Sequence, residues 1–123
     1  MTSISKLSYK CLRKKYGTRL VKEPLHVHEF LGSTKLAGIT LHNHRFAGVS
    51  SRAIPVGKKH VHAILTNVDF TVEHIHRIRT LTGLPIPVGR GRHVHFVRGT
   101  TSFDAAHDHN FVFATLIQNP LGL

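Results

Sequence analysis

The stretch HVHFVRGTTSFDAAHDHNFVF, residues 93–113, places two His-x-His triplets on either side of a turn-forming segment. The run that follows His93 is rich in valine and aromatic residues, and so is the run that follows His107. Such residues favour strands, whereas the segment between them, residues 99–104, offers Gly, Thr, Ser and Asp for a turn. The stretch therefore predicts a β-hairpin.

The same pattern occurs twice more upstream. All 12 histidines fall into His-x-His pairs, and every second pair recurs after 34 and then 33 residues, at His26, His60 and His93. A fixed period of this length is typical of a repeat architecture. We predict an all-β fold: three tandem hairpin repeats forming a small barrel, prism or sandwich, with a basic N-terminal arm. The arm covers residues 1–25, and the single β domain consists of units 26–59, 60–92 and 93–123.

Prolines mark the expected links between the units. Pro55 precedes the second unit, and Pro85 and Pro87 precede the third. Because proline breaks helices and cannot donate to a strand ladder, we expect these segments to end strands.

The histidine pairs carry the chemistry. In a strand, residues i and i+2 point to the same face, so each pair directs both imidazoles one way. If the partner strand of a hairpin brings its own pair alongside, four imidazoles converge. This predicts three four-histidine sites or one longer histidine track. The candidate metal ligands are His26, His28, His42, His44, His60, His62, His74, His76, His93, His95, His107 and His109.

Neutral imidazole is a good ligand for Zn, Cu, Ni and Fe, and the sequence does not choose among them. Haem is a further cofactor that histidine can ligate, but no other feature of the sequence supports it. Two alternatives stay open at this point. The histidines could form a purely structural imidazole network, or they could act as a pH switch, since their usual pKa lies near 6.5.

Apolar residues share the predicted histidine face, which indicates that this face is enclosed. They are Phe30, Phe46, Ile64, Val72, Ile78, Val97, Phe111 and Phe113. The opposite face carries mainly charged residues, interrupted by Val27, Ile75 and Phe96. Its charged members are Glu29, Arg45, Glu73, Arg77, Arg98 and Asp108. Asp104 lies three residues before a pair, and a carboxylate so placed can fix the tautomer of a ligating histidine.

From about Leu25 onward the chain resembles the YmaF-like family, small bacterial proteins built from His-x-His repeats. The resemblance is carried by HVHEFLGST at 26–34, HNHRFAGV at 42–49, IPVG at 54–57 and HVHFVRGTT at 93–101. It covers about four fifths of the chain and leaves out the basic arm. The resemblance implies the repeat architecture but no particular activity.

Charge indicates a further class of partner. The chain has 17 Lys and Arg against 6 Asp and Glu, a net charge of +11, and its first nineteen residues are strongly basic. This favours an anionic partner at the arm, and a polyanion- or nucleic-acid-binding function is the lowest-ranked alternative. The one cysteine, Cys11, excludes an internal disulfide framework. No apolar run is long enough for a membrane span, and we expect a cytoplasmic location, with assembly at a cell or spore surface as an open alternative.

Catalysis is not expected. Carboxylates are scarce, motifs such as HExxH and the Gly-rich phosphate loop are missing, and a catalytic site is rarely reiterated in every repeat. The sequence therefore predicts a non-catalytic, histidine-mediated metal-binding protein that forms a homo-oligomer. The first alternative is a self-assembling protein, a filament or shell, whose histidine clusters are structural.

Overall fold

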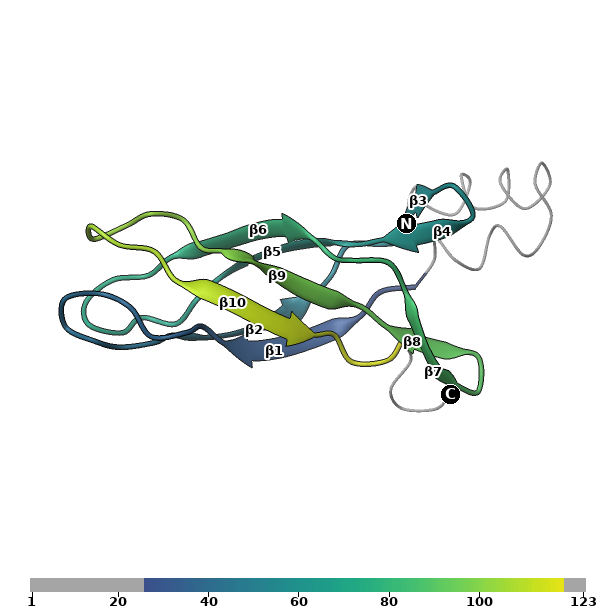
Figure 1. Ribbon diagram of the computed structural model, residues 1–123, viewed down its shortest axis with the longest axis horizontal. Coiled ribbons are helices and arrows are strands. Elements are labelled where there is room, and N and C mark those ends of the chain that lie inside the picture. The colour runs from purple at the N-terminus through teal and green to yellow at the C-terminus, as the bar shows by residue number, and fades with distance from the viewer. Residues whose placement is uncertain (1–25, 119–123) are drawn as a thin grey trace.

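The computed structural model describes residues 26–118 as an all-β structure, which confirms the predicted fold class. The basic arm, Cys11 and residues 119–123 lie outside the described residues, so the predictions about them stay predictions. The described part contains three long antiparallel hairpins, separated by two short ones (Figure 1). The long hairpins are β1 (Glu29–Ser33) with β2 (Arg45–Val49), β5 (Ala63–Asn67) with β6 (Arg77–Leu81), and β9 (Phe96–Thr100) with β10 (Asn110–Ala114).

The short hairpins are β3 (Ile54–Val56) with β4 (Lys59–Val61), and β7 (Ile86–Gly89) with β8 (Arg92–Val94). They occupy the segments expected to link the units, but our expectation that these segments end strands is wrong. Pro55 pairs with His60, and Pro87 pairs with His93. A two-stranded sheet has only edge strands, and an edge strand accepts proline because its outward side needs no N–H donor.

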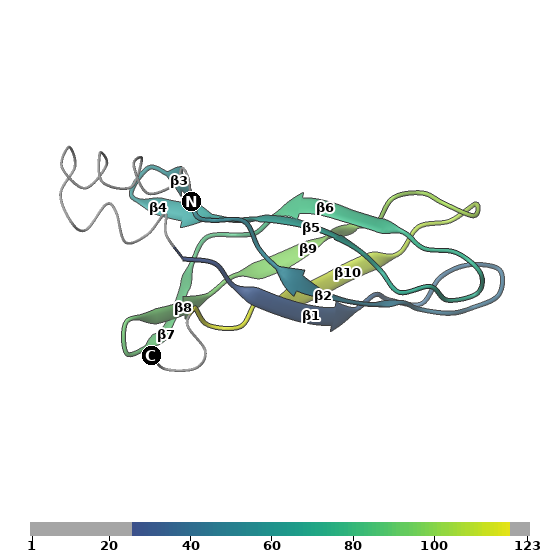
Figure 2. The same ribbon diagram turned by 180° about the vertical axis from the view of Figure 1, so that it is seen from behind.

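Each long hairpin packs against both others, with the turn-bearing loops gathered at one end and the short hairpins at the other (Figures 1 and 2). Backbone hydrogen bonds join neighbouring hairpins near both ends. Ser51 N–H donates to Ala63 O, for example, and Asp69 N–H donates to Arg45 O. In the described residues the strands pair only two by two, so the predicted closure into a barrel, prism or sandwich is not confirmed.

A small hydrophobic core lies along the inside of the three hairpins. It consists of Phe30, Phe46, Ile64, Val68, Ile78, Val97 and Phe111, with Phe113 partly buried against it. The enclosed face predicted from the sequence is confirmed, except at Val72. This residue is exposed because it lies in a two-residue turn with φ of 51°, not in a strand. The charged residues predicted for the outer face are exposed.

Candidate metal centres

Antiparallel pairing sends the two histidine pairs of each hairpin to opposite ends. Each pair directly precedes its strand, and the two strands of an antiparallel hairpin begin at opposite ends. The register pairs Glu29 with Val49, so the pair at His28 lies beside the end of β2 and far from the pair that precedes β2. The predicted four-histidine site within one hairpin is therefore wrong.

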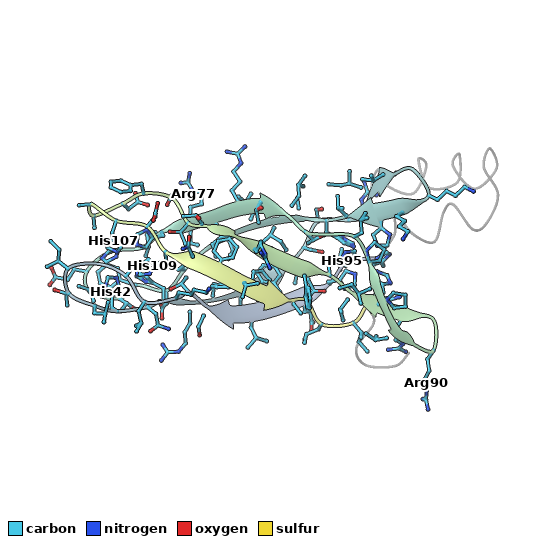
Figure 3. All side chains as sticks on the ribbon, viewed as in Figure 1. His42, Arg77, Arg90, His95, His107 and His109 are labelled. Carbon is cyan, nitrogen blue, oxygen red and sulfur yellow. The ribbon has the colours of Figure 1, made fainter. Side chains whose placement is uncertain are left out.

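The pairs instead gather across the three units, into two clusters of six. In each cluster the candidate ligand atoms all lie within 4.8 Å of one another. The linker-end cluster, beside the short hairpins, contains His26, His28, His60, His62, His93 and His95. The loop-end cluster, beside the loops of the long hairpins, contains His42, His44, His74, His76, His107 and His109. Figure 3 shows His42, His107 and His109 together at the loop end and His95 at the linker end.

The Nε2 atoms of the loop-end cluster turn toward a common centre. His107 Nε2 lies 3.1 Å from His109 Nε2 and 3.2 Å from His42 Nε2. The same atom lies 3.2 Å from the Nε2 atoms of both His74 and His76. His44 is the one ring of the cluster for which no such approach to His107 occurs within the described residues.

The other nitrogen of every loop-end ring faces a backbone carbonyl. His44, His76 and His109, the second members of their pairs, place Nδ1 2.8–3.0 Å from the carbonyls of Asp69, Ser102 and Lys35. His42, His74 and His107 place Nδ1 2.5–2.9 Å from the carbonyls of Thr40, Val72 and Ala105 in their own loops. A carbonyl only accepts, so each Nδ1–H donates, and a neutral ring then carries a bare lone pair on Nε2.

In the linker-end cluster, the second histidine of each pair, which we call the inner histidine, is held in the same way. Nδ1–H of His28, His62 and His95 donates to the carbonyls of Leu116, Ser51 and Gly83 over 2.7–2.8 Å. His93 Nε2 lies 3.1–3.2 Å from the Nε2 atoms of His26, His28 and His60. His62 Nε2 is buried and has no hydrogen-bond partner. A buried, unpaired nitrogen of this kind costs free energy unless a ligand occupies the space in front of it.

Burial disfavours the charged form of several of these imidazoles. Desolvation, together with the neighbouring histidines, lowers the pKa of His60 to about 4 and of His93 to about 3. Desolvation also lowers the pKa of His28 to about 4 and of His62 to about 3, against the opposing effect of their carbonyl partners. In the loop-end cluster, burial lowers the pKa of the inner rings His44, His76 and His109. Neutral rings are the form that binds a metal ion.

Hydroxyl groups fix the backbone of the inner histidines, and our sequence analysis missed them. The backbone N–H of His28 donates to Ser50 Oγ, and that of His62 donates to Thr82 Oγ1, each over 3.0 Å. The backbone N–H groups of His44, His95 and His109 are held in the same way, by Thr34, Thr115 and Thr101.

A spacing in the sequence marks these hydroxyls. The residue six positions after the second histidine of every pair is Ser or Thr, except in one case, where Val68 follows His62. Val68 holds the corresponding place beside His76, because its N–H donates to His76 O as Thr82 N–H donates to His62 O.

Two carboxylates contact the loop-end cluster. Asp104 Oδ2 lies 3.6 Å from Nδ1 of His76, not beside the pair that Asp104 precedes, and the Nδ1–H of His76 donates to Ser102 O over 2.9 Å. The tautomer of His76 is therefore fixed by a carbonyl and not by Asp104. Asp69, which the sequence analysis did not single out, lies 3.3 Å from His44 Nδ1. Hydrogen bonds from Arg45 N–H and Thr71 Oγ1 help to lower the pKa of Asp69 despite its partial desolvation.

Strained turns position the first histidines of two pairs, His74 and His107. Val72 and Glu73 have φ of 51° and 59°, and Ala105 and Ala106 have φ of 52° and 65°. Non-glycine residues rarely adopt this left-handed conformation, least of all a β-branched one. These turns bring the carbonyls of Val72 and Ala105 to the Nδ1 atoms of the next histidines. The strain is therefore located where the loops orient their ligating nitrogens.

In the described part of the chain, no helix has the length and hydrophobicity that spanning a bilayer requires.

A family model, YmaF, with the description "Spore germination protein GerY/YamF", matches residues 23–117. No match was found among curated proteins or among solved structures.

Proposed function

The chain belongs to the YmaF family, and we propose that it binds two transition-metal ions, one in each six-histidine cluster. One observation carries the proposal. The Nδ1–H groups of the loop-end histidines donate to backbone carbonyls, and the Nε2 lone pairs point toward one centre. A cation at that centre would satisfy all of these lone pairs at once.

A network of imidazole–imidazole hydrogen bonds is a poor substitute for the ion. Such a bond needs one Nε2–H, which a neutral ring has only if it gives up its Nδ1–H and the carbonyl bond that depends on it. A doubly protonated ring has both, but burial lowers the pKa of His44, His76 and His109 and disfavours this form. Nε2 atoms 3.1–3.3 Å apart without a donor between them repel one another.

The bound ions would act as structural staples or as a metal store rather than in catalysis. A catalytic metal keeps a coordination position open for water or substrate, whereas here six nitrogens surround each centre. Each ion would join all three repeats, and metal binding supplies folding free energy to a domain whose core is small. Haem does not suit these clusters, because six converging imidazoles occupy the plane that the porphyrin needs.

Titration of metal-free protein with Ni²⁺, Co²⁺, Fe²⁺ and Zn²⁺, followed by calorimetry, tests the proposal. We expect two ions per chain. His74→Ala with His107→Ala should remove the loop-end ion, and His60→Ala with His93→Ala should remove the linker-end ion. Asp108→Asn is the matched control, because this exposed residue lies between two ligands but faces outward. Binding that ignores both double variants would refute the proposal.

Self-assembly is the second candidate, and the outer faces of the long hairpins favour it. Each outer face presents an exposed large apolar residue: Leu31 at 63%, Leu65 at 65% and Phe96 at 61%. Exposed apolar residues on the edges and faces of small sheets promote association. Size-exclusion chromatography with light scattering of the metal-loaded chain tests this candidate. A monomer at all concentrations would rule it out, and Leu31→Lys with Leu65→Lys should dissociate an oligomer.

A polyanion is the third candidate partner. Besides the arm, the described residues offer a pocket of about 700 Å³ between the two short hairpins, with Lys58, Lys59 and Arg92 among its lining. Binding of a nucleic acid or another polyanion there would weaken steeply with added salt. Binding that survives removal of residues 1–22 but is lost in Lys58→Ala with Lys59→Ala would assign it to the pocket.

The family description also points to a process. We extend the proposal to spore germination: metal binding by this chain would affect how fast spores germinate. Spores that carry the double histidine variants should then germinate at a different rate from spores that carry Asp108→Asn.

A further inference from the structure

The geometry points to octahedral, six-nitrogen coordination in both clusters, and hence to selection of Fe²⁺, Co²⁺ or Ni²⁺ over Zn²⁺. This inference rests on the proposed function, because it specifies which ions the two sites take. It depends on how the six rings of a cluster are placed relative to one another.

The rings of the loop-end cluster occupy the corners of an octahedron. Every ring lies edge-to-face with the other rings of the cluster, with centroids 4.8–5.0 Å apart, except for one ring opposite it. Within the described residues the opposite pairs are His42 with His76, His44 with His107, and His74 with His109. An octahedron has three such opposite pairs, whereas a trigonal prism pairs each corner with more than one distant corner.

The size of the octahedron suits a six-coordinate ion. Neighbouring Nε2 atoms are 3.2 Å apart, and dividing this edge by √2 places the centre about 2.3 Å from each nitrogen. Opposite nitrogens would then be separated by about 4.5 Å, which agrees with the 4.8 Å limit of the whole group. Tetrahedral zinc instead holds four ligands, with Zn–N of about 2.0–2.1 Å.

The linker-end cluster has the same arrangement. Its rings approach one another edge-to-face, with centroids 4.6–5.1 Å apart. His93 Nε2 lies 3.1–3.2 Å from the Nε2 atoms of His26, His28 and His60. Within the described residues no such approach joins His93 to His62, as expected for opposite corners.

Anchoring of the rings makes rearrangement to four ligands costly. The inner rings are tied at Nδ1 to carbonyls of the neighbouring hairpin, and the backbone N–H groups of most of them are tied to hydroxyls. A zinc ion that took four nitrogens would leave two buried lone pairs without a partner. Zinc has no geometric preference of its own to offset this loss, and Cu²⁺ prefers a tetragonally distorted site. Regular six-nitrogen coordination therefore favours Fe²⁺, Co²⁺ and Ni²⁺, with Ni²⁺ the tightest of these three.

Competition and spectroscopy on the full chain test the inference. Metal-free protein is dialysed against equal concentrations of Ni²⁺ and Zn²⁺, and bound metal is quantified. We expect two ions per chain, with nickel in at least about tenfold excess over zinc, which corresponds to roughly 1.4 kcal/mol. In parallel, the Co²⁺-loaded protein should show the weak d–d absorption of octahedral cobalt and not the intense bands of tetrahedral cobalt.

The outcomes separate this inference from the proposed function. Preferential zinc binding together with intense Co²⁺ bands would overturn octahedral selection while leaving metal binding in place. Failure to bind any of these ions would overturn both. Bound nickel should fall from two ions to one per chain in His74→Ala with His107→Ala, which breaks the loop-end octahedron, and should stay at two in Asp108→Asn. Two nickel ions per chain in both variants would show that the six-nitrogen geometry is not the source of nickel binding.

Discussion

Replacing Thr82 by valine isolates the contribution of one hydroxyl to the linker-end cluster. Thr82 is 5% exposed, and its Oγ1 accepts the backbone N–H of His62 over 3.0 Å. Valine has nearly the same shape but no acceptor, so Thr82→Val leaves a buried N–H without a partner. Such a loss costs about 1–3 kcal/mol. A change of 2 kcal/mol would lower the Tm of a domain of this size by roughly 8–16 °C.

Thermal unfolding of metal-free and metal-loaded protein, followed by circular dichroism, measures this effect. Thr80→Val is the matched control, because Thr80 lies two residues earlier, within β6, and its hydroxyl lies 3.4 Å from Leu81 O. The linker-end ion should also bind about tenfold more weakly in Thr82→Val, since groups that orient a ligand commonly contribute this much.

Val68 gives the reverse test. It occupies the place beside His76 that Ser or Thr occupies beside the other inner histidines, so Val68→Thr should supply an acceptor for His76 N–H and raise the Tm. Equal Tm values for Thr82→Val and Thr80→Val, with no gain from Val68→Thr, would refute the role assigned to the hydroxyls.

Three further predictions concern acid, turns and packing. The unfolding free energy of metal-free protein should fall as the pH is lowered from 6.5 to about 4, because in this window the unfolded chain binds protons that the folded chain excludes. His28 alone is expected to contribute roughly 3 kcal/mol to this loss. Urea unfolding at each pH measures it. A flat profile in this window would contradict the neutral cluster. Val72→Asn with Glu73→Gly should stabilise the protein by about 1 kcal/mol, because Asn-Gly suits a turn with positive φ, and a lower Tm would contradict the strain. Gly48→Ala should lower the unfolding free energy by about 1–3 kcal/mol, because the added Cβ would lie 2.8 Å from a core phenylalanine ring. The control Gly83→Ala, whose Cβ would have its nearest neighbour at 3.4 Å, should be close to neutral. Equal effects of the two substitutions would refute the packing argument.

The strands and their inward face could be predicted from the sequence because both depend on local alternation. Residues i and i+2 share a face, so His28 and Phe30 had to point the same way, as did His109 and Phe111. The failure at Val72 shows the limit of this rule. Alternation holds only within a strand, and the two-residue turn that contains Val72 interrupts it.

The composition of the sites could not be predicted in the same way. Which pairs meet depends on hairpin register and on packing between hairpins, and neither is a local property. Placing the two pairs of one hairpin side by side was wrong because His28 faces Ser50, six residues beyond the second histidine of the next pair. The Ser or Thr six residues after the second histidine of nearly every pair marks the position that faces a histidine of the partner strand. This spacing therefore indicates the register, and it is the signal that could have corrected the prediction.

Elemental analysis of the full chain, purified without an affinity tag and without added chelator, tests the central claim most directly. Our account predicts two transition-metal ions per chain, and one ion per chain in His74→Ala with His107→Ala. A correctly folded protein that contains no stoichiometric metal, and takes up none when Fe²⁺, Co²⁺, Ni²⁺ or Zn²⁺ is supplied, would contradict it.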